Sequence, residues 1–113
     1  MTIEEISSEN FTLSEKYSLQ ITSLDYTDNT LLCRLEFFQN VFIQVYFNII
    51  KKKKSYALIV SSERIFGIDN LGGFIHKHPF EDPNKHIPIH DKDYSLEKFI
   101  LESIQILKEL QIL

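Results

Sequence analysis

The chain has 113 residues, of which 43% are hydrophobic and 25% charged, so it has the size and composition of one folded domain and is neither disordered nor of low complexity. Its single cysteine, Cys33, excludes an intramolecular disulfide and a cysteine-based zinc finger. The net charge is −4, but residues 41–80 hold six bases against two acids, so this stretch is where an anion would be attracted.

These properties predict one domain over residues 1–113 of a cytoplasmic protein. The lone cysteine favours a reducing compartment. No apolar run approaches the roughly 20 residues that a membrane helix needs, so we expect no membrane partner.

The N-terminal half of the chain predicts a β-sheet. Residues 1–16 are weakly patterned and indicate an N-terminal arm or a short helix. Over residues 17–69, apolar and polar side chains alternate, which predicts a meander of about five antiparallel strands. Asp28-Asn29 and Gln39-Asn40 are turn signals within this region. The alternation of Cys33 with leucines predicts that it lies in the core.

The end of the meander and the C-terminal part are patterned differently. Gly67 in the last strand indicates a β-bulge or a close approach of another backbone segment. Residues 70–94 lack a regular pattern and predict an ordered loop that contains histidines and prolines. Asp93 or Ser95 caps a helix within residues 95–112. The fold class is therefore α+β, an antiparallel meander with the C-terminal helix packed on one face.

Two surface features of the meander have polar character. The outer face of the third strand carries Gln44, Tyr46 and Asn48, so it meets water or a partner. Lys51–Lys54 interrupts the strand pattern and is either a solvated hairpin tip or a phosphate contact with Tyr46 and Tyr56 as stacking aromatics.

The densest group of reactive side chains follows the last strand. His76 and His78 are two residues apart, so they point to the same side of an extended segment. A turn between His78 and His86 could bring His86 back beside the pair. Asp69, at the end of a strand, could hydrogen-bond a histidine and fix its tautomer.

Three interpretations of this group remain open. His76, His78 and His86 could hold zinc or another divalent metal, since three protein ligands and a water make a catalytic zinc site. Two histidines facing a phosphodiester could instead deprotonate a 2′-hydroxyl and protonate the leaving oxygen, while Lys77 or Lys85 stabilises the phosphoryl charge. In the third interpretation the histidines only satisfy backbone groups or face water.

The order of these motifs resembles a known family. Glu36-Phe37-Phe38, the long strand with Tyr46, Phe66–Asn70, the His76-Lys77-His78-Pro79 segment, His86 and a C-terminal helix are together similar to the small TumE-type toxins of toxin–antitoxin systems. The resemblance implies a protein that acts on RNA and is restrained by a helix-turn-helix antitoxin. It also implies functional roles for Asp69, His76, His78 and His86.

The leading hypothesis is the toxin component of a toxin–antitoxin system, a ribonuclease that needs no metal or other cofactor. In it His76 and His78 are the acid–base pair, and His86 and Asp69 orient them. Lys77, Lys85 and Tyr46 bind the substrate. The expected partners are RNA, an antitoxin and a second copy of the chain. The alternatives are a non-enzymatic protein-interaction module and a small metal-binding domain.

Overall fold

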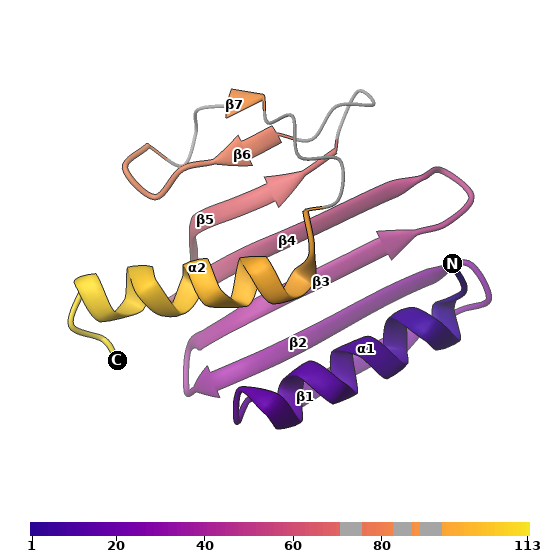
Figure 1. Ribbon diagram of the computed structural model, residues 1–113, viewed down its shortest axis with the longest axis horizontal. Helices are drawn as coiled ribbons and strands as arrows, with labels where there is room; N and C mark the ends of the chain where they lie inside the picture. Colours follow the sequence, from indigo (N-terminus) through magenta and orange to yellow (C-terminus); the bar gives the residue numbers. More distant parts are fainter. Residues whose placement is uncertain (71–75, 83–86, 89–93) are drawn as a thin grey trace.

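The computed structural model describes residues 1–70, 76–82, 87–88 and 94–113. It has an α+β fold, in which an antiparallel sheet is covered on one face by two helices (Figure 1). This confirms the predicted fold class. The sheet has seven strands where about five were predicted, and a helix at the N-terminus joins the predicted C-terminal one.

The seven strands pair in chain order, so every neighbour in the sheet is also the neighbour in sequence. Their bounds are β1 (Gln20–Tyr26), β2 (Thr30–Phe38), β3 (Val41–Asn48), β4 (Lys53–Val60), β5 (Glu63–Asp69), β6 (His76–His78) and β7 (Ile87–Pro88). The segment predicted to be an irregular loop, residues 70–94, therefore contributes two short strands. The rest of that segment, apart from Asn70, residues 79–82 and Tyr94, lies outside the described residues.

The N-terminal segment folds as the helix α1 (Ile3–Lys16) because it carries a complete capping box. The Thr2 hydroxyl accepts a hydrogen bond from the Glu5 amide at 3.1 Å, and the Glu5 carboxylate accepts one from the Thr2 amide at 3.2 Å. Ile6 and Leu13 are buried against the sheet, although the whole helix is only weakly amphipathic. The strand predicted to begin near residue 17 starts at Gln20, because Tyr17 still caps α1.

The C-terminal helix α2 (Leu96–Glu109) was predicted from its apolar stripe, and its start is set by Ser95. The Ser95 hydroxyl accepts a hydrogen bond from the Lys98 amide at 3.1 Å. Phe99 is stacked on Phe66 of β5 with ring centroids 4.8 Å apart. Figure 1 shows α1 and α2 on the same side of the sheet and running in the same direction.

The two faces of the sheet have different characters because side chains alternate along each strand. The helix face carries the core, which includes Cys33, Ile43, Leu58 and Phe66. The other face, called the open face below, carries the side chains between them. Its central residues are Leu32, Arg34, Phe42, Gln44, Tyr46, Ser55, Ala57, Ile59, Arg64, Gly67, Asp69 and His78.

In the part of the chain that the structure describes, neither helix is long and apolar enough to cross a membrane.

Candidate active site

A β-bulge in β5 decides which side chains meet on the open face. Leu58 of β4 pairs with Phe66, but the next residue, Ile59, pairs with Arg64, so Ile65 is an extra residue. Without the bulge, Arg64 and Phe66 would share the helix face, because they are two residues apart. The bulge turns Arg64 to the open face, where Asp69 also lies. Bulges commonly redirect a side chain in this way beside active sites.

Gly67 allows Arg64 to lie across β5 towards β6. A Cβ atom at Gly67 would lie 3.3 Å from Cδ of Arg64 and 3.3 Å from the Tyr56 carbonyl oxygen. It would also lie 3.6 Å from Cδ2 of His78, the residue that pairs with Gly67 on β6. The sequence signal at Gly67 therefore marks a close approach, while the bulge itself lies two residues earlier.

Asp69, His78 and Arg64 form a continuous chain of polar contacts. Nε2 of His78 is in hydrogen-bond contact with the Asp69 carboxylate. Nδ1 of the same ring is 3.4 Å from Nη2 of Arg64. His78 is 2% exposed and Asp69 8%, whereas Arg64 is exposed. The chain thus leads from a buried carboxylate to a guanidinium at the surface.

The donors available fix the tautomer of His78. A guanidinium has only N–H donors, so Nδ1 of His78 must accept from Arg64. The ring proton is then on Nε2, which donates to Asp69. The carboxylate thus holds the ring in the form whose lone pair is on Nδ1, the nitrogen that faces Arg64. It is the form that acts as a general base in other Asp–His pairs.

Asn70, next to Asp69, fixes the lysine-rich hairpin to the same end of the sheet. Its side-chain nitrogen Nδ2 donates to the Lys52 carbonyl at 2.7 Å, and its side-chain oxygen Oδ1 accepts from the Lys54 backbone amide at 2.8 Å. The Asp69-Asn70 dipeptide therefore joins two features: Asp69 holds His78, and Asn70 holds the hairpin. Lys51–Lys54 was predicted to interrupt the strand pattern. Lys53 and Lys54 instead belong to β4, so the prediction is wrong for these two residues.

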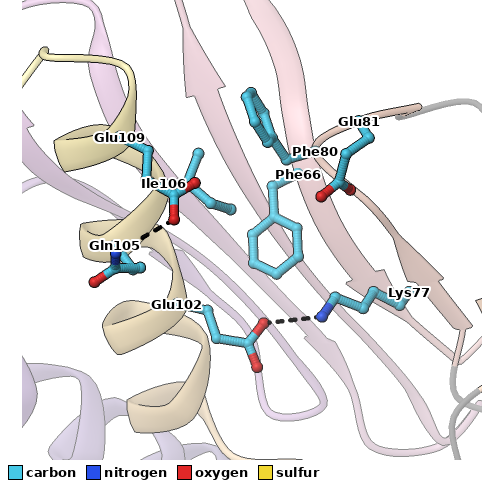
Figure 2. Close-up of a pocket in the computed structure, with 8 residues that line it drawn as sticks. All are labelled: Phe66, Lys77, Phe80, Glu81, Glu102, Gln105, Ile106 and Glu109. Carbon is cyan, nitrogen blue, oxygen red and sulfur yellow. Dashed lines mark hydrogen bonds and ion pairs between the residues drawn. The ribbon is translucent and has the colours of Figure 1, made fainter.

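Lys77 is on the opposite face from His78. It pairs with Ile68, its Nζ is 3.3 Å from the Glu102 carboxylate of α2, and it lies 5.4 Å from the ring centroid of Phe66. Figure 2 shows Lys77 directed at Glu102 within a cleft of about 230 Å³ between α2 and β6. The alternation that gives residue 78 one side of the strand gives residue 77 the other. The structure therefore does not bring Lys77 to the histidine.

The other predicted site residues are placed as follows. Tyr46 is half-buried on the open face, and its row across the sheet continues through Ser55 to Asp69, two strands away. The backbone of His76 pairs with Asp69 in the register of β5 and β6. Lys85 and His86 lie outside the described residues, so their proposed roles stay predictions.

The positions of the two tyrosines do not support a phosphate contact at the lysines with both Tyr46 and Tyr56 as stacking aromatics. Tyr56 is 3% exposed and lies in the core on the helix face, in contact with the rings of Phe47 and Phe99. Burial and the charge of Glu9 raise the pKa of its hydroxyl. Tyr46 is on the other face of the sheet.

Within residues 1–70, 76–82, 87–88 and 94–113, no group of three or more His, Cys, Asp or Glu side chains could hold a metal ion. Nε2 of His78 is already bound to Asp69. Cys33 is 1% exposed, and burial raises the pKa of its thiol to about 11, which fits a core residue and not a reactive thiolate.

Sequence reasoning missed Arg64 and the contacts of Asn70. The pattern placed Arg64 at the start of a strand, where a positive charge is ordinary, and nothing in a single sequence marks the extra residue at Ile65. Asn70 had a signal, since its dipeptide with Asp69 belongs to the family resemblance, but the sequence does not show what the amide contacts.

The chain matches no protein-family model, no curated protein and no solved structure.

Proposed function

We propose that this protein is a cytoplasmic, TumE-like toxin that cleaves RNA at the open face of its sheet. The observation that carries this proposal is the row of polar contacts from Asp69 through His78 to Arg64. It combines a carboxylate that orients an imidazole, a nitrogen lone pair able to accept a proton, and a guanidinium suited to a phosphate.

The charge distribution favours approach of RNA from the open face and the hairpin. The two helices carry half of the acids of the described residues on the opposite face, namely Glu4, Glu5, Glu9, Glu15, Glu97, Glu102 and Glu109. The hairpin residues Lys51–Lys53 are exposed, and so are Arg34 and Arg64 on the open face. A phosphate backbone is repelled by the first group and attracted by the second.

The reaction follows from the order of groups between solvent and Asp69. Arg64 is exposed, so an RNA phosphate meets it first, and binding draws the guanidinium towards the phosphate and away from Nδ1 of His78. Nδ1 then accepts the proton of the 2′-hydroxyl while the 2′-oxygen bonds to phosphorus. The bond from phosphorus to the 5′-oxygen breaks, and that oxygen takes a proton from a general acid. His76, paired with Asp69 in the register, stays the predicted acid. The products are a 2′,3′-cyclic phosphate and a 5′-hydroxyl.

Growth of a bacterial host after tightly controlled induction tests the proposal. The wild-type chain should arrest growth, and Arg64→Gln should abolish the arrest at equal soluble expression. Arg34→Gln is the matched control, because Arg34 is also exposed on the open face but rests over the ring of Phe42, 4.1 Å from its centroid. RNA from arrested cells should carry new 5′-hydroxyl ends. Normal growth with the wild type, or equal arrest with both variants, contradicts the proposed site.

The alternative function is a protein-interaction module. The cleft of Figure 2 supports it, because Glu81, Glu102 and Glu109 surround an apolar floor that includes Phe80 and Ile106. In that case wild type and Arg64→Gln leave growth equally unaffected, and a stoichiometric complex survives the Arg64 substitution but not Glu109→Lys.

A further inference from the structure

The two helices leave one part of the helix face uncovered, at the ends of β3 and β4 beside the lysine hairpin. In Figure 1 this is the region between the chain's N-terminus and the start of α2. Two adjoining hollows lie there, of about 350 Å³ and about 200 Å³, and Ile6, Phe47 and Lys54 line both of them. We call the two together the hairpin cleft.

The hairpin cleft is apolar at one end and cationic at the other. The larger hollow is enclosed by Ile6 and Glu9 of α1, Tyr56 of β4, and Ser95 and Leu96 at the start of α2. The smaller hollow extends to the hairpin, where it is lined by Asn48, Ile49, Lys52, Lys53 and Asn70. The floor between the two ends is Phe47, whose ring is 5.9 Å from that of Tyr56.

The charged groups of the cleft favour an anion at the hairpin end. Lys52 and Lys53 are exposed there, and Asn70 holds the backbone that presents them. Lys54 is fixed along the wall, because its Nζ donates to the Tyr94 carbonyl at 2.8 Å and lies 5.7 Å from the ring centroid of Tyr56. Among the described residues that line either hollow, Glu9 is the one acid, and it belongs to the far end.

The dimensions suit a small amphipathic molecule. The larger hollow is within the range of about 300–1,000 Å³ that is typical of small-molecule sites. From Lys53 to Tyr56 the cleft follows three residues of β4, or about 10 Å at the usual rise of a strand. An acyl chain of medium length fills such a path, and its carboxylate then reaches the lysines.

We propose that the hairpin cleft binds a medium-chain carboxylate, with its acyl tail over Phe47 between α1 and α2 and its carboxylate at Lys52 and Lys53. This site goes beyond the proposed RNA cleavage. Its acyl tail lies on the helix face, whereas Asp69, His78 and Arg64 meet on the open face, and the two sites share only the hairpin lysines.

A chain-length series measured by NMR titration tests the tail. Hexanoate, octanoate and decanoate, each below its micelle concentration, should shift the backbone amides of Phe47, Tyr56 and Leu96. Each added methylene should tighten Kd by about fourfold, so decanoate binds about 15-fold tighter than octanoate. Equal affinity along the series, or shifts confined to other parts of the chain, overturns the proposal.

Charge variants test the carboxylate end. Lys52→Met/Lys53→Met keeps the aliphatic stems and should weaken decanoate binding by about tenfold, as expected for two exposed charge contacts. Lys108→Met, an exposed lysine near the end of α2, is the matched control and should bind as the wild type does. Unchanged affinity in the double variant overturns the proposal, and so does equally tight binding of decanol.

Two further measurements distinguish this site from the proposed RNA site and from a lipid-binding surface. Arg64→Gln should leave decanoate binding unchanged even though it abolishes RNA cleavage, so failure of one proposal is distinguishable from failure of the other. Vesicles of phosphatidylglycerol should compete poorly with decanoate. Binding to vesicles with none to free decanoate would assign the lysines to a lipid surface and overturn the proposal.

Discussion

Replacing His78 with alanine should destabilise the whole domain and not only remove a reactive group. The ring is 2% exposed and contacts the Asp69 carboxylate, which is itself 8% exposed. The buried carboxylate loses its donor and the missing ring leaves a cavity, which together typically cost about 3–5 kcal/mol. For a domain of this size that cost lowers Tm by about 12–20 °C.

Urea unfolding followed by circular dichroism, together with calorimetry, measures this effect. Asp69→Ala and the double variant Asp69→Ala/His78→Ala complete a double-mutant cycle. We expect the two single changes to sum to more than the double change by about 1–3 kcal/mol, since the second substitution removes a group that the first left without its partner. If Tm of His78→Ala stays within about 2 °C of the wild type, the pair is not a buried structural contact and the reasoning fails.

Two further predictions concern the hairpin and the core. Asn70→Ala should lower the free energy of unfolding by about 2 kcal/mol, because it removes two side-chain hydrogen bonds to the hairpin backbone. It should also accelerate hydrogen exchange at the Lys54 amide. Unchanged exchange at that amide would refute the role of Asn70. Burial raises the pKa of Cys33 from 9.0 to about 11, so the folded state keeps a proton that the unfolded chain releases. The stability from this group is complete well below pH 9 and falls by about 2 kcal/mol as pH rises to 11. Urea midpoints of wild type and Cys33→Val across this range should therefore diverge, and parallel curves would contradict the assigned environment.

The contribution of His78 to the stability of the domain also affects tests of function. A loss of growth arrest in His78→Ala would mix chemistry with unfolding, whereas Arg64 is exposed and can be replaced without opening the core. Arg64 and Arg34 variants therefore report on function, whereas His78 variants report on stability.

Local pattern was sufficient for much of the fold. Alternation of side chains predicted the meander and the burial of Cys33, and the apolar stripe with Ser95 predicted α2, because these features depend on periods of two and about 3.6 residues within one element. For residues 1–16 the same reasoning left an arm or a short helix open, and the structure forms the helix. There the capping box of Thr2 and Glu5, a local signal that the sequence does contain, outweighs the weak amphipathic pattern.

The candidate site was only partly within reach of the sequence. Its residue types and the position of Asp69 at a strand end indicated a carboxylate–histidine contact, and the structure forms that contact with His78. Two elements of the site depend on how strands pair. Lys77 turns to α2 because β6 adds to the sheet edge with residue 78 on the open face, and Arg64 joins that face because β4 and β5 shift register at Ile65.

The sequence by itself thus determined the α+β class, the order of most strands, the C-terminal helix and the reactive residue types. Tertiary structure alone decided that Arg64 lies beside His78, that Asn70 fixes the lysine hairpin, and that α1 and α2 leave a cleft next to it. The physical reason is that periodicity is encoded within a single element, whereas register, bulges and helix placement are set by contacts between elements far apart in the chain.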